Sequence, residues 1–268
     1  MSTSNSTGTA LITGASSGIG FTYADRLAKR GYDLLLVARD QGRLEEMATR
    51  LRETGVKVEV LKADLIDKDD LDTVQQRLRT DASISLLVNN AGVASVGTLA
   101  ASELGGLDRM IQLNVVALTY LASAAADNFS KAGRGSIINI ASVVPLLPER
   151  FNATYAATKA YVLSLTQSLE AELKVSGVRV QAVLPGATRT EIFDRSGMDL
   201  SKFPAEMVME VGEMVDAALA GFDQGELVTI PSLADAADWD AFITARSALG
   251  PNLSLSSAAA RYKKASAA

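Results

Sequence analysis

Short apolar runs alternate with longer helical patterns from about residue 9 to about residue 230 of the chain. Most of these runs are apolar throughout, which indicates strands that are buried on both faces of a parallel sheet. The helical patterns between successive runs supply the layers that cover the two faces. We therefore expect a doubly wound, Rossmann-type α/β fold with a mostly parallel seven-stranded sheet and helices on both faces. The expected strands are Thr9–Thr13, Asp33–Ala38, Val56–Lys62, Ile84–Asn89, Gly135–Ala141, Val178–Leu184 and Leu227–Ile230.

The segments between the expected strands have apolar residues at helical spacing and residues typical of helix ends. Asp40 and Asp67 stand just before two of them, where N-caps are favoured. No internal repeat or linker interrupts the alternation, so we expect a single domain of this Rossmann-type fold over residues 9–250. Residues 1–8 and 251–268 are expected to be N-terminal and C-terminal tails. The expected helices are Gly20–Arg30, Gln41–Glu53, Lys68–Arg79, Ser102–Ser130, Tyr155–Val175 and Pro204–Phe222.

The 268 residues include neither histidine nor cysteine. Ser/His/Asp catalysis, thiolate nucleophiles, disulfides and metal sites built on His or Cys are therefore excluded, and no metal is expected. General acid or base work falls to Tyr, Lys, Asp or Glu. With 26 Lys and Arg against 31 Asp and Glu, the net charge is −5, and no strongly basic tract is present. This balance argues against binding to nucleic acid.

We find no targeting or membrane signal in the sequence. The first ten residues, MSTSNSTGTA, lack the basic-then-apolar order of a signal peptide. No stretch approaches the roughly 18 apolar residues of a membrane span. The expectation is a cytoplasmic protein that does not bind a membrane.

A glycine-rich turn follows the first expected strand. Thr13 leads directly into Gly14-Ala15-Ser16-Ser17-Gly18-Ile19-Gly20, and a helix begins there. Glycine lets the backbone turn sharply and approach a pyrophosphate, while the helix start offers free N–H groups and the positive end of its dipole. Three glycines can also serve only a tight turn, but the position between strand and helix favours a dinucleotide site.

Further motifs occur in order along the chain, at strand ends or on the helices that follow. They are Asn89-Asn90-Ala91-Gly92, Asn114, Ser142, Tyr155-Ala156-Ala157-Thr158-Lys159 and Pro185-Gly186. With the TGxxxGxG pattern of the glycine turn, this series resembles the classical short-chain dehydrogenase/reductase family over residues 9–230. The resemblance implies an oxidoreductase that acts on CH–OH or C=O groups with a nicotinamide cofactor.

The spacing of Tyr155 and Lys159 suits the proton transfer that carbonyl reduction needs. The proton donor has to be poised near working pH, and the ordinary pKa of tyrosine, about 10, is too high unless a cation favours the phenolate. Residues i and i+4 share a helix face, with Cβ atoms about 5 to 6 Å apart. The ammonium of Lys159 is therefore expected near the Tyr155 oxygen.

The resemblance assigns roles to these residues. Tyr155 is the general acid in reduction and the base in oxidation, and Lys159 lowers its pKa and holds the nicotinamide ribose. Ser142 hydrogen-bonds the substrate oxygen. Asn114 holds a water that links Lys159 to solvent, or else only bonds a neighbouring backbone. Asp64 contacts adenine, or else caps a helix. The cofactor-binding residues implied in this way are Gly14, Ser16, Ser17, Gly18, Ile19, Gly20, Arg39, Asp64, Asn90, Ala91, Gly92, Tyr155, Lys159, Pro185, Gly186, Thr188 and Thr190.

The end of the second expected strand discriminates between NAD and NADP. An acid there binds the free 2′-hydroxyl of the adenosine ribose and repels a 2′-phosphate. Here Ala38 is followed by Arg39, whose guanidinium can bind a phosphate with two hydrogen bonds. Asp40 suits an N-cap better than a ribose contact. Ser17 departs from the basic residue of some NADP-preferring members, so Arg39 carries the selection largely alone, and the expected cofactor is NADP.

The expected substrate side is mostly apolar. Residues 192–204 should form a substrate loop that includes Phe193, Met198 and Phe203, and further apolar residues follow Ser142. These side chains suggest a small-molecule substrate that is a mostly apolar carbonyl compound or secondary alcohol, unless they only pack the lid and the strand ends.

The end of the chain departs from many ketoreductases of the family that act on acyl carrier proteins. Those end in a strand and a DGG-type turn, whereas here Pro231 follows the last strand and a further segment, 234–248, comes after it. This difference argues against a carrier-bound substrate and against the usual tetramer interface. Apolar residues on more than one face of the helix over 155–175 still predict a homodimer or homotetramer.

Two other functions remain open at this point. A sugar-nucleotide epimerase-like enzyme also uses a YxxxK pair, but in longer chains with a C-terminal substrate domain. A non-catalytic, NADP-binding redox regulator would keep the fold without the chemistry, and the intact set of Asn114, Ser142, Tyr155 and Lys159 speaks against it.

Overall fold

The computed structural model describes residues 7–197 and 199–263 of the chain. Its contacts divide the chain into two compact units, and the division falls after Pro231. The domain expected over residues 9–250 extends past this division, because α9 (Ala236–Ser247) belongs to the second unit. The expected tails, 1–8 and 251–268, lie partly outside the described residues.

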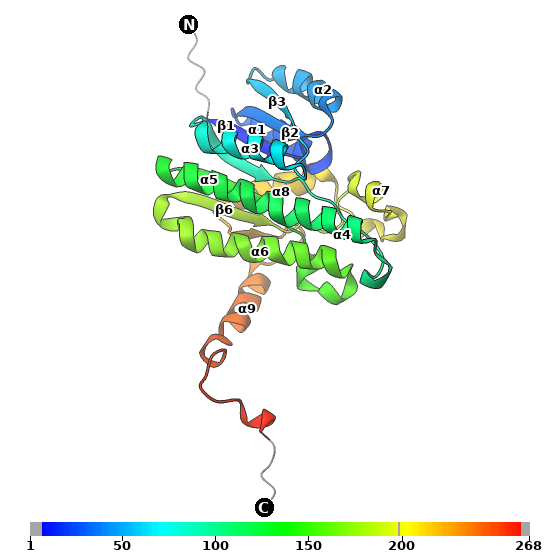
Figure 1. Ribbon diagram of the computed structural model, residues 1–268, viewed down its shortest axis with the longest axis vertical. Helices are drawn as coiled ribbons and strands as arrows, with labels where there is room; N and C mark the ends of the chain where they lie inside the picture. Colours follow the sequence, from blue (N-terminus) through cyan, green and yellow to red (C-terminus); the bar gives the residue numbers. More distant parts are fainter. Residues whose placement is uncertain (1–6, 198, 264–268) are drawn as a thin grey trace, which may run out of the picture. The chain divides into compact units, whose positions relative to one another are not determined.

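The first unit is built on one sheet with the strand order β3-β2-β1-β4-β5-β6-β7 (Figure 1). This order confirms the doubly wound fold, and every pairing between the named strands is parallel. The expected bounds differ from the observed ones only at some strand ends. The strands are β1 (Thr9–Thr13), β2 (Asp33–Ala38), β3 (Val58–Lys62), β4 (Ile84–Asn89), β5 (Gly135–Ile140), β6 (Val178–Val183) and β7 (Val228–Thr229).

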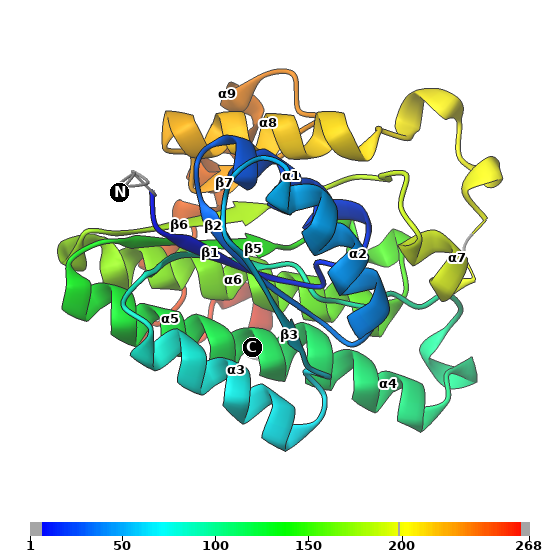
Figure 2. The ribbon, with the colours of Figure 1, turned by 90° about the horizontal axis from the view of Figure 1, so that it is seen from above.

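Helices cover both faces of the sheet because the inner strands are apolar on both sides. Ala10 and Ile12 of β1 pack in the core that α1, α2 and α8 share, while Leu11 packs in the core of α3, α5 and α6. Figure 2 shows α1, α2 and α8 on one side of the sheet and α3, α4 and α5 on the other. The helices of this unit are α1 (Gly18–Lys29), α2 (Gln41–Arg52), α3 (Lys68–Thr80), α4 (Leu104–Ile111), α5 (Leu118–Ala132), α6 (Ala153–Leu173), α7 (Ile192–Ser196) and α8 (Val211–Gln224).

The long helix expected over residues 102–130 contains an irregular turn. Residues Gln112–Ala117 form a π-helical turn between α4 and α5. The whole stretch Leu104–Ala132 is apolar and long enough, by length and composition only, to cross a membrane, which the sequence analysis did not expect. Nevertheless 44% of its most apolar window is buried in the protein. Since α5 packs against α3, β4 and β5, its apolar residues belong to the core.

The second unit contains α9. Asp235 caps this helix by accepting a hydrogen bond from the N–H of Ala237 at 2.9 Å. The rings of Trp239 and Phe242 lie 5.3 Å apart between their centres, and no residue of α9 is buried.

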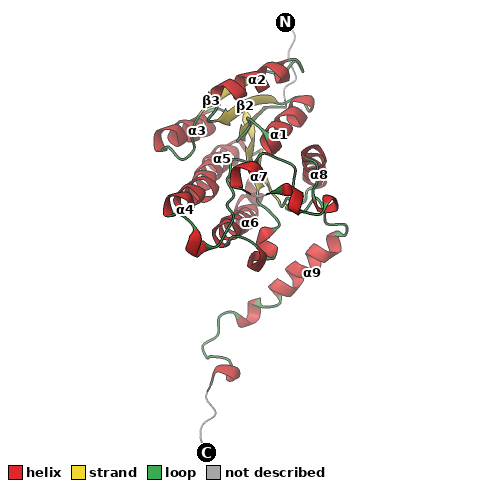
Figure 3. Cartoon of the chain, turned by 90° about the vertical axis from the view of Figure 1, so that its right-hand side faces the viewer, coloured by secondary structure: helices red, strands yellow, loops and turns green. Residues whose placement is uncertain are grey.

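From β1 the strand order runs to β2 and β3 on one side of the sheet and to β4 through β7 on the other, so the order reverses between β1 and β4. In open parallel sheets, ligands bind in the crevice at the carboxyl ends of the strands where this reversal occurs. The glycine turn follows β1, and Asn90 to Gly92 follow β4, so both motifs lie at this crevice. Figure 3 shows the strands, in yellow, between the helices, among them α6, which carries Tyr155 and Lys159.

Candidate active site

The turn after β1 has a backbone that favours glycine. Gly14 and Gly18 have positive φ angles of 65° and 52°, and a Cβ on Gly20 would lie 2.4 Å from the carbonyl oxygen of Gly14. α1 begins at Gly18 without a side-chain cap and without an acidic residue in its first turn. Ser16, Ser17 and Ile19 complete the turn, whose backbone N–H groups suit an anion.

Asn90 braces this turn. Its Nδ2 donates to the carbonyl oxygens of Thr13 at 2.8 Å and of Gly14 at 3.3 Å. The hydroxyl of Thr13 in turn accepts hydrogen bonds from the N–H groups of Asn90 and Ala91, both at 3.0 Å. The sequence placed Asn90 among the cofactor-binding residues. Its amide nitrogen is occupied by the turn, which favours a positioning role for the side chain.

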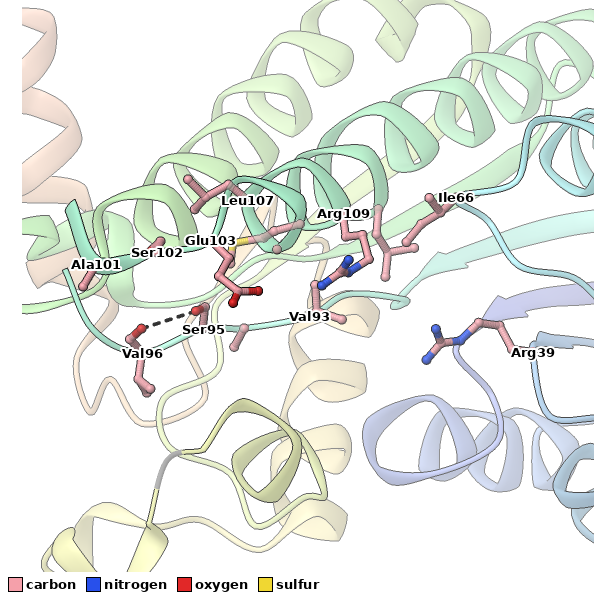
Figure 4. A pocket seen from close by; sticks show the side chains of 14 residues that line it. Arg39, Ile66, Val93, Ser95, Val96, Ala101, Ser102, Glu103, Leu107 and Arg109 are labelled. Carbon is pink, nitrogen blue, oxygen red and sulfur yellow. Dashed lines mark hydrogen bonds between the residues drawn. The ribbon is translucent and has the colours of Figure 1, made fainter. Parts of the chain in front are cut away.

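Arg39 and Asp40 have different roles at the end of β2. Asp40 accepts a hydrogen bond from the N–H of Arg43 at 3.0 Å and caps α2, as the sequence predicted. Arg39 is exposed and lines a hollow together with Glu103 and Arg109 of the segment around α4 (Figure 4). Glu103 and Arg109 could not be identified from the sequence, because nothing in their spacing indicates that they line the same pocket as Arg39.

Asp64 lies just after β3 and does not cap the next helix. The side chain of Asp67 caps α3 by accepting hydrogen bonds from the N–H groups of Asp69 and Asp70 at 3.0 Å. Asp64 instead accepts a hydrogen bond from the N–H of Ile66 at 3.2 Å, in a tight turn. The helix-cap interpretation of Asp64 is therefore wrong.

Ser142, Tyr155 and Lys159 come together at the carboxyl end of β5. Ser142 follows this strand, and Tyr155 lies in the first turn of α6, where its N–H donates to the cap residue Asn152 at 2.9 Å. One turn later, the Nζ of Lys159 lies 6.0 Å from the centre of the Tyr155 ring. A Cβ on Gly92 would lie 3.7 Å from this Nζ, so the chain after β4 passes close to the lysine.

Burial controls the protonation of both side chains on α6. Burial raises the pKa of Tyr155 to about 12, and a hydrogen bond with the Ser142 side chain opposes this shift. Burial lowers the pKa of Lys159 to about 8, and its ammonium donates to the carbonyl oxygen of Ile140 at 2.8 Å. That Lys159 lowers the pKa of Tyr155 stays a prediction. The ammonium lies against Ile140, and the hydrogen bond with Ser142 offsets part of the rise in the pKa of the phenol.

Asn114 ties the segment after β4 to the π-helical turn. Its Oδ1 accepts a hydrogen bond from the N–H of Val93 at 2.9 Å, and its Nδ2 donates to the carbonyl oxygen of Val93 at 2.8 Å. The same Nδ2 lies 3.2 Å from the hydroxyl of Thr158, the residue before Lys159. This is the backbone contact that the sequence left open as an alternative. Turns of the π type are frequent at functional sites, which agrees with this position.

The segment after β6 reaches both Ser142 and the glycine turn. The carbonyl oxygen of Pro185 accepts a hydrogen bond from the hydroxyl of Ser142 at 3.4 Å. Gly186 is exposed and Thr188 is buried. The methyl carbon of Thr190 lies 3.3 Å from the place of a Cβ on Gly18. The structure therefore brings the motif after β6 against the motif after β1.

Apolar side chains lie on the expected substrate side. Phe193 is buried, and its ring meets that of Phe203 edge-on with 5.9 Å between the ring centres. These two residues therefore pack against each other within the expected substrate loop, residues 192–204. Leu147 and Phe151 are exposed at 44% and 42%. Met198 lies outside the described residues.

These elements fit a nicotinamide dinucleotide. The glycine turn is a cradle that a Cβ would fill, and Arg39 stands at the end of the neighbouring strand. Lys159, beside Tyr155, lies close to the segment after β4. Among the residues that the structure describes, no three acidic side chains gather as a metal ion would require. The fold and the site define a dinucleotide-binding oxidoreductase.

Comparisons with known proteins agree with this class. The family described as short chain dehydrogenase matches residues 8–200, and the chain belongs to the short-chain dehydrogenase/reductase family. A diacetyl reductase, (S)-acetoin forming, of Staphylococcus epidermidis is 32% identical over 211 residues, which cover 78% of this chain and 81% of that protein.

Two solved structures are more similar. A short-chain dehydrogenase from Sphingobium yanoikuyae in complex with NADPH is 55% identical, with a TM-score of 0.92 over 95% of this chain and 100% of that chain. A bulky-bulky ketone specific alcohol dehydrogenase from Comamonas testosteroni is 48% identical, with a TM-score of 0.88 over 95% of this chain and 98% of that chain.

Proposed function

We propose that the protein is an NADP(H)-dependent oxidoreductase that interconverts a mostly apolar ketone and the corresponding secondary alcohol. The observation that carries this proposal is the convergence of Ser142, Tyr155 and Lys159 at the carboxyl end of β5, beside the crevice between β1 and β4. A proton donor, a hydrogen-bond donor and a cation are thereby collected at one place.

The chain's own residues handle the proton and the substrate oxygen. Bound NADPH supplies the hydride for the carbonyl carbon. Tyr155, which its raised pKa keeps protonated at neutral pH, donates a proton to the substrate oxygen in reduction and accepts it in oxidation. Ser142 donates a hydrogen bond to the same oxygen. Lys159 places a buried positive charge 6.0 Å from the centre of the Tyr155 ring and holds the nicotinamide ribose.

NADP is favoured over NAD by the end of β2. Ala38 offers no carboxylate to a ribose 2′-hydroxyl, and Asp40 is engaged in capping α2. Arg39 is exposed at the crevice and can form charge-assisted hydrogen bonds to a 2′-phosphate. The NADPH complex of the Sphingobium relative supports the same cofactor.

The substrate class follows from the apolar residues after Ser142. Leu147 and Phe151, which follow Ser142 within ten residues of the sequence, expose apolar surface, and the Comamonas relative is specific for bulky-bulky ketones. The test is to incubate the purified protein with NADPH and a series of ketones that carry two large substituents, while the loss of NADPH absorbance is followed. Diacetyl and a ketoacyl thioester serve as small and carrier-type comparisons. If no ketone is turned over while NADPH binds, the catalytic proposal fails and a regulator is favoured.

A homodimer or homotetramer is part of this proposal. Ile111, Tyr120 and Tyr161 expose 42%, 49% and 38% of their surface on α4, α5 and α6. Three exposed apolar side chains on neighbouring helices suit a subunit interface. Light scattering on the eluting protein measures the mass, and a monomer at micromolar concentration would contradict the expectation.

A further inference from the structure

An ion pair joins two segments that are far apart in the sequence at the mouth of the crevice. Nη1 and Nη2 of Arg43, in the first turn of α2, donate to the two carboxylate oxygens of Glu191 at 3.0 and 2.5 Å. Glu191 directly follows Thr190 and begins the loop that carries α7. Both side chains are about two-fifths exposed, at 40% and 41%. The bidentate geometry fixes the orientation of the two side chains relative to each other.

This pair completes a closed ring of contacts. Thr190 lies against Gly18 of the glycine turn, and the N–H of Arg43 is bonded to Asp40 just after β2. Since β1 and β2 are neighbours in the sheet, the ring runs from the glycine turn through β1, β2 and the start of α2 to Arg43, and back through Glu191 and Thr190. The glycine turn and Arg39, where the dinucleotide is proposed to bind, both lie on this ring.

We propose that Arg43 and Glu191 are positioning residues that form a strap over the bound cofactor and slow its release. The proposal rests on the proposed function only in requiring that NADP(H) binds at the glycine turn. Opening the ion pair frees the loop after Thr190 from α2 and lets the cofactor leave. Neither residue touches the reacting atoms.

The exposure of the pair limits the size of the effect. Ion pairs that remain in contact with water contribute little, so the strap opens often and binding is not blocked. Removing the Glu191 charge by Glu191→Gln should raise the dissociation rate of NADPH roughly twofold to fivefold. Because a strap acts on the loop and not on the 2′-phosphate, the dissociation of NADH should rise by the same factor.

The competing role for Arg43 is a direct bond to the 2′-phosphate. In that case Glu191 would compete with the phosphate, so Glu191→Gln would leave NADPH release unchanged or make it slower. Arg43→Met would then accelerate the release of NADPH but not of NADH. Either result would overturn the strap.

The experiment is stopped-flow displacement of NADPH, and separately of NADH, by excess NADP⁺, followed by the fluorescence of the reduced cofactor. Glu191→Gln, Arg43→Met and the double variant form a cycle that isolates the pairwise contribution. The charge-exchanged variant R43E/E191R should return the rates toward those of the unaltered protein, and no recovery would count against the pair.

A matched control is available on the same face of the sheet. Arg30 and Asp223 form an equally two-pronged exposed pair, with both distances 2.9 Å, between the end of α1 and α8. Arg30 lies one 12-residue helix away from the glycine turn, about 18 Å at the usual rise per residue. Asp223→Asn should leave both dissociation rates unchanged. If the unaltered protein binds no NADPH, the proposed function has failed; if it binds and releases NADPH at the same rate as Glu191→Gln, only the strap has failed.

Discussion

The ammonium of Lys159 donates to the carbonyl oxygen of Ile140 at 2.8 Å, while it lies 6.0 Å from the centre of the Tyr155 ring. The lysine is thus fixed by the end of β5, one helical turn from the tyrosine and on the same side of α6. Its charge is buried, and this burial lowers its pKa from 10.5 to about 8. Burial raises the pKa of Tyr155 and lowers the pKa of Lys159, and each shift favours the neutral form of that side chain.

The buried lysine predicts a pH dependence of stability. Above about pH 8 the folded protein releases the Lys159 proton, whereas the unfolded chain keeps it to the ordinary value of 10.5, so the free energy of unfolding rises with pH in this window. The expected rise is about 2 kcal/mol between about pH 8 and pH 9.5, relative to Lys159→Met. Denaturant unfolding of both proteins at several pH values measures it.

The upper limit of that window is set by the tyrosine. Folding raises the pKa of Tyr155 from 10.0 to about 12. The free energy of unfolding that this shift contributes is therefore lost as the pH rises from 10.0 to about 12. Measurements below about pH 9.5 avoid this opposite slope. If the free energy of unfolding depends on pH in the same way in the unaltered protein and in Lys159→Met, folding does not lower the pKa of Lys159.

Tyr155→Phe should remove the proton donor and leave the cofactor site intact. The rate of ketone reduction is expected to fall by about 100-fold to 10,000-fold, the usual contribution of a general acid. NADPH affinity, measured by titration of its fluorescence, should stay close to that of the unaltered protein. Tyr161→Phe is the control, because this tyrosine is also on α6 but its hydroxyl pairs with that of Thr119 at 2.9 Å. Unchanged turnover in Tyr155→Phe would favour a different proton donor.

The fold was predictable because its signals are local. The continuous apolar runs placed β1, β2 and β4 with their observed bounds, and Asp40 and Asp67 marked the starts of α2 and α3. The π-helical turn within the long helix was not predicted, because its composition does not differ from that of the α-helical turns around it. The separation of α9 from the first unit depends on contacts that no local pattern reports.

The site was predictable in position and less so in electrostatics. Strand ends in a parallel sheet meet at one edge, so motifs after β1, β4, β5 and β6 had to converge. The partner of a charged side chain depends on its direction and on distant segments. The contacts of Lys159 with Ile140 and of Arg43 with Glu191 are therefore absent from the sequence-based analysis.

Arg39→Asp should reverse the cofactor preference. The change removes charge-assisted hydrogen bonds to the 2′-phosphate and adds a repulsive carboxylate, so NADPH affinity is expected to fall roughly tenfold to a hundredfold. NADH affinity should be unchanged or improved, because the new acid can accept a hydrogen bond from the free 2′-hydroxyl. Arg134→Asp, the same change of charge at an exposed residue just before β5, controls for the net charge. An unaltered ratio of NADPH to NADH affinity in Arg39→Asp would refute this role of Arg39.

Gly20→Ala tests the cradle itself. The new Cβ would lie 2.4 Å from the Gly14 oxygen and 2.5 Å from the Asn90 Nδ2, so the turn and its brace have to move apart. Overpacking of this kind costs about 1 to 3 kcal/mol of stability, and NADPH binding should be lost or strongly weakened because the N–H groups of the turn are displaced. Thermal unfolding and fluorescence titration measure the two effects.

Gly42→Ala provides the contrast, because it is also in the first turn of a helix but no neighbouring atom lies closer than 3.5 Å to its Cβ. The free energy of unfolding of this variant should rise by roughly 0.5 to 1 kcal/mol, since alanine loses less backbone entropy than glycine when the helix folds. Normal NADPH affinity in Gly20→Ala would mean that the cofactor lies elsewhere. A Gly42→Ala variant that is destabilised as much as Gly20→Ala would mean that close contact at the turn is not what makes glycine necessary there.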